Sequence, residues 1–169
     1  NITLLTATRL TTNACYRFTP PFIAIIAKGF DVSLSQIGIA LTVSELSGLL
    51  SPFIGRFVDH LSRRGAMLIG LLGIGAGSAL AAISPNIFMF TVGVTLISVT
   101  KNFFDLGMAG WISDHVPYEK RGRYIGITEI SWALGLLIGV SAMGVITALI
   151  SWRAGFVAGA CGIIVSLAF

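Results

Sequence analysis

Long apolar runs separated by short polar breaks dominate this sequence of 169 residues. A helix needs about 20 mostly apolar residues to cross a bilayer. Six segments meet or approach that length, at about 2–27, 35–58, 65–83, 86–113, 124–150 and 154–169. The sixth run is still apolar where it stops, so we expect that helix to be truncated. Charged residues make up 11% of the chain, against about 25% in typical soluble domains, which also favours a membrane protein.

The apolar runs predict helices rather than strands. They are too long for barrel strands and lack the strict alternation of apolar and polar residues that such strands show. Helices satisfy their backbone hydrogen bonds internally, as the bilayer interior requires. Ser33 or Ser35 can cap the second helix, Pro85 ends the third, and residues 118–123 form a charged connection after the fourth. Short connections make neighbouring helices antiparallel, so we expect an all-α, polytopic helical bundle.

Basic residues in the connections predict the orientation of the chain. The second and fourth connections carry Arg56, Arg63, Arg64, Lys120, Arg121 and Arg123. The connections expected on the other side carry only Lys28 and Arg153. Basic connections stay in the cytoplasm, so we expect a plasma (inner) membrane protein with a cytoplasmic N-terminus. The net charge of +4 is too small and scattered to indicate nucleic-acid binding.

Six charged residues lie inside the predicted spans: Arg9, Arg17, Glu45, Lys101, Asp105 and Glu129. Charges at membrane depth are costly and usually face a cavity or a partner. Helical spacing places one polar set on a single face of the first helix, namely Arg9, Thr12, Asn13, Tyr16 and Arg17. Lys101 and Asp105 are four apart and can pair, and Glu129 shares a face with Trp132.

Two interpretations of these charges remain open. In the first, Asn13, Arg17, Glu45, Lys101, Asp105, Glu129 and Trp132 line a substrate cavity or relay protons. In the second, the charged residues form structural ion pairs that hold the helices in register. Arg9 lies nearer the cytoplasmic end, where its side chain can instead snorkel to the interface.

The connection between the second and third predicted helices carries a motif. Gly55, Asp59, Arg63 and Arg64 match the signature loop of the major facilitator superfamily, with His60 and Ser62 replacing its usual arginine and glycine. The chain therefore resembles that family at the expected point of its topology. The resemblance implies that the loop latches the cytoplasmic side, with Gly55 allowing close helix approach. Alternatively, Arg63 and Arg64 only fix the topology.

Two later features are also similar to the family. Asp114, Pro117, Arg121 and Arg123 resemble its connection after the fourth helix. The fifth predicted helix carries Gly135, Gly139 and Gly144, similar to the glycine-rich pattern of the family's drug/proton antiporters. Val140 stands where those antiporters usually have proline. Glycines four apart also let helices pack closely without any further role.

The resemblance implies a twelve-helix parent, of which residues 1–169 form the N-terminal half. The substrate site is then expected between the two halves. The expected function is secondary active transport of a small molecule by alternating access, with proton-coupled efflux as its form. The expected partners are the lipid bilayer, the substrate, a proton and the C-terminal half, without a cofactor or a metal ion.

An enzyme is not expected. The histidines, His60 and His115, lie in predicted loops, so no base at membrane depth can activate a serine such as Ser141. The sequence also contains no cluster of metal-ligating residues. The remaining alternative is a receptor or assembly scaffold that does not transport, which would bind a ligand without moving it across the membrane.

Overall fold

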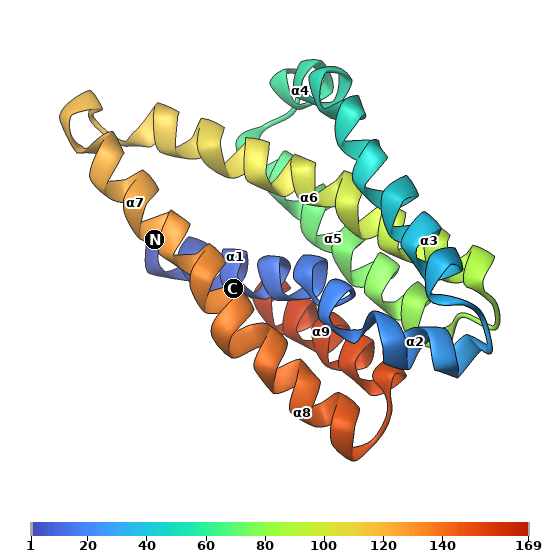
Figure 1. The fold of residues 1–169 in the computed structure, drawn as a ribbon. Coiled ribbons are helices and arrows are strands. Elements are labelled where there is room, and N and C mark those ends of the chain that lie inside the picture. The colour runs from blue at the N-terminus through green and yellow to red at the C-terminus, as the bar shows by residue number, and fades with distance from the viewer. Residues whose placement is uncertain (1, 169) are drawn as a thin grey trace.

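The computed structural model describes residues 2–168, and these residues form helices and no strand. Six helical segments cross back and forth between two ends of the molecule (Figure 1). In chain order the elements are α1 (Ile2–Arg17), η1 (Pro20–Phe22), α2 (Ile23–Phe30), α3 (Leu34–Leu46), η2 (Ser47–Leu50), α4 (Ser51–Asp59), α5 (Arg63–Ile83), α6 (Ile87–His115), α7 (Tyr118–Leu134), η3 (Gly135–Val140), α8 (Ser141–Leu149) and α9 (Trp152–Leu167). The predicted all-α bundle is confirmed.

Four continuous helical stretches are long and apolar enough to cross a membrane, at Leu34–Asp59, Arg63–Ile83, Ile87–His115 and Tyr118–Leu149. The α9 helix is apolar but shorter, with 16 residues. Together with the predominance of exposed apolar side chains, these stretches identify a polytopic integral membrane protein.

The first segment differs from the continuous helix that we expect over about 2–27. It breaks after Arg17 into α1, the short 3-10 helix η1 and α2. Pro20 and Pro21 stand at this break and have no backbone N–H to donate, so the α-helical ladder cannot run through them. The α2 helix then continues to Phe30, and Asp31 ends it in the left-handed conformation, with φ 55°.

The later helices begin at cap residues that the sequence makes recognisable. The Ser33 hydroxyl accepts a hydrogen bond from the Gln36 backbone N–H, and the Gln36 side chain accepts one from the Ser33 backbone N–H, so α3 opens with a capping box. Asn86 caps α6 through the N–H of Met89 at 2.9 Å. Ser151 caps α9 in the same way. These caps satisfy N–H groups that the first helical turn leaves without partners.

The connection between α6 and α7 is shorter than the sequence suggests. Residues 118–123, which we expect to form a charged loop, are the first turns of α7. Arg121 donates hydrogen bonds to the carbonyls of Ser113 at 2.6 Å and Val116 at 3.0 Å. These carbonyls end α6 and lack helical partners, so Arg121 ties the start of α7 to the end of α6.

Close helix contacts form the core. A Cβ atom at Gly77 of α5 would lie 2.7 Å from the carbonyl oxygen of Gly93 in α6, so these two backbones nearly touch. Three phenylalanines are fully buried and pack together: Phe18 directly after α1, Phe90 of α6 and Phe156 of α9. The ring centroids of Phe18 and Phe156 are 4.9 Å apart in a T-shaped arrangement, which aromatic pairs prefer.

Candidate functional site

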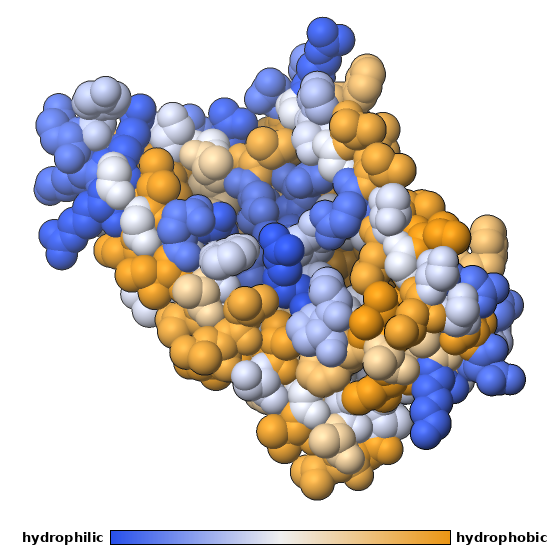
Figure 2. Space-filling model, viewed as in Figure 1, coloured by the Kyte–Doolittle hydropathy of each residue, from blue (hydrophilic) through white to orange (hydrophobic). Residues whose placement is uncertain are grey.

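A polar cavity opens on one face of the bundle. Hydrophilic residues gather at the centre of this face and are flanked by hydrophobic ones (Figure 2). The cavity has a volume of about 230 Å³. Residues of α1, α3, η2, α6 and α7 line it, namely Arg9, Asn13, Tyr16, Arg17, Glu45, Gly48, Ser98, Lys101, Asn102, Asp105 and Trp132. Of the sequence-predicted cavity residues, the structure brings all except Glu129 onto this lining.

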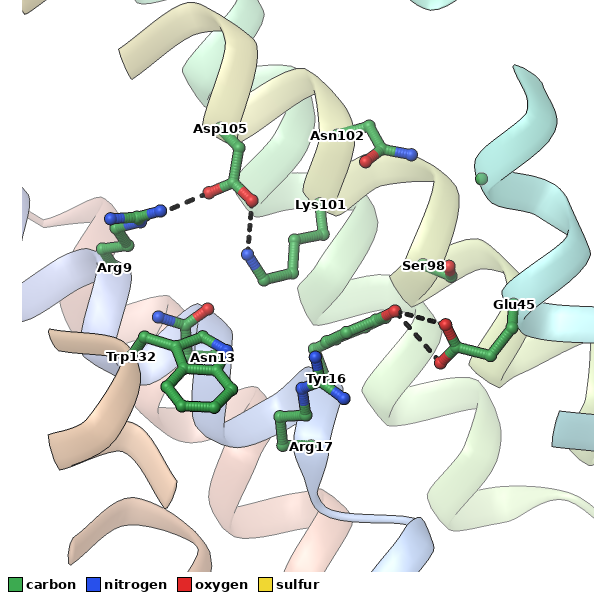
Figure 3. A pocket seen from close by; sticks show the side chains of 11 residues that line it. Arg9, Asn13, Tyr16, Arg17, Glu45, Ser98, Lys101, Asn102, Asp105 and Trp132 are labelled. Atoms are coloured by element: carbon green, nitrogen blue, oxygen red, sulfur yellow. Dashed lines mark hydrogen bonds and ion pairs between the residues drawn. The ribbon is translucent and has the colours of Figure 1, made fainter. Parts of the chain in front are cut away.

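Ion pairs connect three helices beside the cavity. Asp105 of α6 accepts from Lys101 Nζ at 2.5 Å and lies 3.6 Å from Arg9 Nε of α1 (Figure 3). Arg9 Nη1 also donates to Glu129 Oε1 of α7 at 2.7 Å. Lys101 is 7% exposed, and a cation so buried requires a partner. Glu129 thus belongs to the same network although it lies outside the cavity lining.

The interface alternative for Arg9 does not hold in this structure. Its side chain is 12% exposed and is held by Asp105 and Glu129 rather than extending to an outer surface. Sequence reasoning therefore left Arg9 out of the site although it recognised the polar face that carries it. Thr12 also differs from the expectation that the whole polar face of the first helix lines the cavity. It is fully buried and donates to the carbonyl of Arg9 at 2.9 Å.

Polar contacts join α1 and α3 to the cavity wall. The hydroxyl of Tyr16 donates to both carboxylate oxygens of Glu45, at 3.0 and 2.8 Å. Ser47 donates to Ser98 of α6 at 3.0 Å, and both serines are buried. Sequence reasoning missed Ser98 and Asn102. Their spacing from Lys101 and Asp105 puts them on the same helical face, which is the signal that could have found them.

Arg17 and Trp132 lie at the other end of the cavity from the ion pairs (Figure 3). The guanidinium of Arg17 is 5.1 Å from the ring centroid of Tyr16 and 5.7 Å from that of Trp132. Among residues 2–168, no carboxylate lies within 4.0 Å of Arg17. Asn13 is next to it on α1, 1% exposed, with a side-chain nitrogen that has no hydrogen-bond partner in the same part of the chain.

Glycines of the fifth segment set the position of α1. A Cβ atom at Gly135 would lie 2.9 Å from Cβ of Asn13 and 3.0 Å from the carbonyl oxygen of Leu10. Gly139 faces Ala14 in the same way, and Gly144 faces the ring of Phe22. Residues Gly135–Val140 form a π-helix, a form that occurs mainly as single turns inside α-helices, often at functional sites.

The signature loop lies at the end of the bundle where α4, α5 and α6 meet. Arg63 Nε donates to Asp114 Oδ2 at 2.8 Å, and Arg63 Nη1 is 4.0 Å from Asp59 Oδ1. Arg64 has no carboxylate within ion-pair distance in the described part of the chain. A Cβ atom at Gly55 would meet nothing within 4 Å. The expected close helix approach at Gly55 is therefore absent among residues 2–168.

The described residues contain no group of three or more His, Cys, Asp or Glu side chains placed to hold a metal ion. The chemistry of the cavity is instead that of paired charges, amides, hydroxyls and an indole ring. Such an arrangement can bind polar atoms of a small molecule.

Comparison with known proteins shows the family of this chain. A model of the Major Facilitator Superfamily matches residues 5–169. The uncharacterized MFS-type transporter YwfA of Bacillus subtilis is 28% identical over 134 residues, which cover 79% of this chain and 32% of that protein. Multidrug resistance protein 2 of Bacillus subtilis is 24% identical, covering 75% and 32%.

The class C tetracycline resistance protein of Escherichia coli is 29% identical over 131 residues, covering 77% of this chain and 33% of that protein. The chain thus spans about a third of the length of the curated relatives that it matches. Since the family match extends over nearly the whole chain, this protein belongs to the Major Facilitator Superfamily.

Proposed function

We propose that this chain forms one wall of a secondary transporter that moves a small polar or amphipathic molecule across the membrane by alternating access. The observation that carries this proposal is the gathering of opposite charges from α1, α6 and α7 beside a cavity in an apolar bundle. Charged groups at membrane depth commonly mark substrate or proton pathways. Relatives named for multidrug and tetracycline resistance support export as the direction.

The second wall of the cavity comes from further segments of the parent protein. Small-molecule sites usually enclose about 300–1,000 Å³, and this cavity of about 230 Å³ is smaller and open on one side. The relatives are about three times as long as the matched region. A C-terminal six-helix half is thus the proposed partner, and the substrate binds between the two halves.

Asp105 is the proposed coupling carboxylate. It is the one group that contacts both Lys101 and Arg9 among the described residues. A proton on Asp105 would remove the negative charge that holds these two cations together, and the contact between α1 and α6 would loosen. Proton uptake from one side would thereby favour one conformation of the cavity. The competing role is a purely structural ion pair.

The loop at Arg63 is proposed to latch the cytoplasmic side. The Arg63–Asp114 pair joins the first residue of α5 to the end of α6. The basic residues of this loop and of the start of α7 support a cytoplasmic location of this end and of the N-terminus, and the plasma (inner) membrane is the proposed location of the protein. Opening of the pair would accompany opening of the cavity toward the cytoplasm.

Flux measurements on the full-length parent test this proposal. The parent is reconstituted in proteoliposomes with an imposed pH gradient and a panel of small polar and amphipathic compounds. Wild type is compared with Asp105→Asn, with the double variant Lys101→Gln/Asp105→Asn, and with Asp31→Asn. Asp31 lies in a connection, and asparagine tolerates its left-handed backbone, so this variant controls for loss of a carboxylate elsewhere.

Gradient-driven flux that both Asp105 variants abolish, and that Asp31→Asn retains, supports a coupling role for Asp105. If the double variant restores the flux that Asp105→Asn loses, the Lys101–Asp105 pair is structural. The reason is that Asp105→Asn leaves the buried lysine unpaired, whereas the double variant removes this lysine as well. Absence of flux for every compound would reject transport and favour a receptor or an assembly scaffold.

A further inference from the structure

Arg17 differs from the other two cations of the cavity. Lys101 and Arg9 each have a carboxylate partner, at 2.5 Å and 2.7 Å. Arg17 has none within 4.0 Å among residues 2–168, and its Nε is buried without a hydrogen-bond partner. The residue is half-buried, and a cation that is partly removed from water is costly when it has no partner. One charge of the cavity is therefore not neutralised by the described residues.

Asn13 supplies a second unpaired donor in the same place. Its residue is 1% exposed, it lines the cavity, and its Nδ2 has no acceptor in the described part of the chain. Gly135 packs against the Cβ of Asn13, which limits the space into which this amide can turn. A fixed amide donor beside a free guanidinium is an arrangement that suits an oxyanion.

Two aromatic rings orient the guanidinium. Tyr16 and Trp132 lie 5.1 and 5.7 Å from Arg17, at distances of cation–π contact (Figure 3). Rings interact with the guanidinium through its face, which leaves its N–H edge available to a planar carboxylate. Trp132 is 46% exposed, so its indole also offers an apolar surface beside this edge.

The acidic side chains around the cavity contact other groups. Both carboxylate oxygens of Glu45 accept from the Tyr16 hydroxyl, and the ring of Tyr16 contacts Arg17. Asp105 pairs with Lys101, and Glu129 pairs with Arg9. None of these three carboxylates lies within 4.0 Å of Arg17 in this arrangement.

We propose that the transported molecule carries an anionic group, a carboxylate or a similar oxyanion, which binds Arg17 and Asn13 while its apolar or aromatic part packs on Trp132. This inference rests on the proposed function, because it names the substrate class of that cavity. Bidentate pairing with arginine is specific for planar oxyanions. A neutral amide of the same shape would lack the charge and one acceptor.

Equilibrium binding to the purified full-length parent in detergent tests the inference without requiring flux. The probes are two matched pairs, phenylacetate with phenylacetamide and indole-3-acetate with indole-3-acetamide. We expect wild type to bind each carboxylate about tenfold or more tightly than its amide, because a charge-assisted hydrogen bond to an unpaired cation is stronger than a neutral one. A tenfold ratio of dissociation constants corresponds to a difference of about 1.4 kcal/mol in binding free energy. Arg17→Gln should reduce this ratio to within about twofold.

Three variants complete the test. Arg17→Lys should keep part of the preference, because it keeps the charge but not the planar fork. Asn13→Ala should reduce the preference even if Arg17→Gln fails to fold. Lys28→Gln removes an equal charge from the exposed last turn of α2 and should leave the preference unchanged. Equal binding of carboxylates and amides by wild type, no binding of any probe, or a full preference in Arg17→Gln would overturn the inference.

The two proposals fail separately. Flux of cationic or neutral compounds without any preference for carboxylates keeps the transporter and rejects the anion site. A preference for carboxylates that Arg17 controls, with no flux of any compound in proteoliposomes, keeps the anion site and rejects transport.

Discussion

Arg9 and Glu129 are 120 positions apart in the sequence, yet Arg9 Nη1 donates to Glu129 Oε1 at 2.7 Å. The same guanidinium lies 3.6 Å from Asp105 through its Nε. One side chain of α1 thus contacts acidic groups of α6 and α7. Because Arg9 contacts both helices, its replacement changes more ion pairs than the replacement of Glu129, which pairs with Arg9 alone among residues 2–168.

Arg9→Gln should lower thermal stability more than Glu129→Gln. Arg9 is 12% exposed and Glu129 56% exposed, so loss of Glu129 removes a largely solvated pair, worth about 1 kcal/mol or less. Loss of Arg9 leaves Glu129 without its cation and leaves Asp105 paired with Lys101 alone. We expect this loss to lower the free energy of unfolding by about 1–3 kcal/mol. Thermal unfolding of the full-length protein in detergent measures both. An equal or larger effect of Glu129→Gln would show that Arg9 does not hold the network together.

Gly135→Ala should damage the protein although alanine favours helices. Its Cβ would lie 2.9 Å from Cβ of Asn13, so η3 and α1 must move apart at the cavity. Overpacking of this kind costs about 1–3 kcal/mol. Gly126→Ala on α7, in the same continuous helical stretch, is the control, because its Cβ would meet nothing within 4 Å. Unfolding temperature and flux are measured for both, and similar behaviour of the two variants would contradict the close contact.

Arg63→Gln should slow transport with little change in unfolding temperature. Arg63 pairs with Asp114 at 2.8 Å at the end of the bundle, where both side chains are partly exposed, so the pair adds little to stability. Its proposed role is to favour one conformation, and flux should therefore fall several-fold. Arg64→Gln is the neighbouring control, since Arg64 has no acidic partner in the described region. Equal flux in the two variants would contradict the proposed latch, and the remaining role of Arg63 would be to fix the membrane topology.

The sequence predicts which positions are polar better than it predicts their partners. The 3.6-residue period places Arg9, Asn13 and Arg17 on one face of the first segment, and the i,i+4 spacing suggests the Lys101–Asp105 pair. Both features are local. The contact of Arg9 with Glu129 depends on how α1 and α7 pack, and no local spacing contains that information. For this reason the sequence leaves the role of Arg9 open between the cavity face and the membrane interface, and it does not single out Ser98 and Asn102.

Helix limits show the same division between local and tertiary causes. The Pro85 break and the Ser33 cap follow from local chemistry and can be recognised in the sequence. The start of α7 at Tyr118 cannot, because its charged first turns resemble a loop. They are stabilised by contacts of Arg121 with the carbonyls that end α6. The break of the first segment at Pro20 and Pro21 has a visible local cause that the length of the apolar run obscured.

Thiol labelling on α7 tests whether the charged face of the bundle lines a water-filled cavity. Trp132 lines the cavity, whereas Ile130 is two residues away, about 200° around the helix. The two residues are exposed to similar degrees, 46% and 56%. A cysteine-free full-length parent, with Cys15 and Cys161 among the residues replaced, carries either Trp132→Cys or Ile130→Cys.

Intact membranes are treated with a water-soluble maleimide, which needs the thiolate and therefore water around the sulfur. We expect labelling of Trp132→Cys and none of Ile130→Cys, because the first thiol meets water and the second meets lipid or an apolar interface. Equal labelling of both variants, or labelling of Ile130→Cys alone, would contradict the cavity.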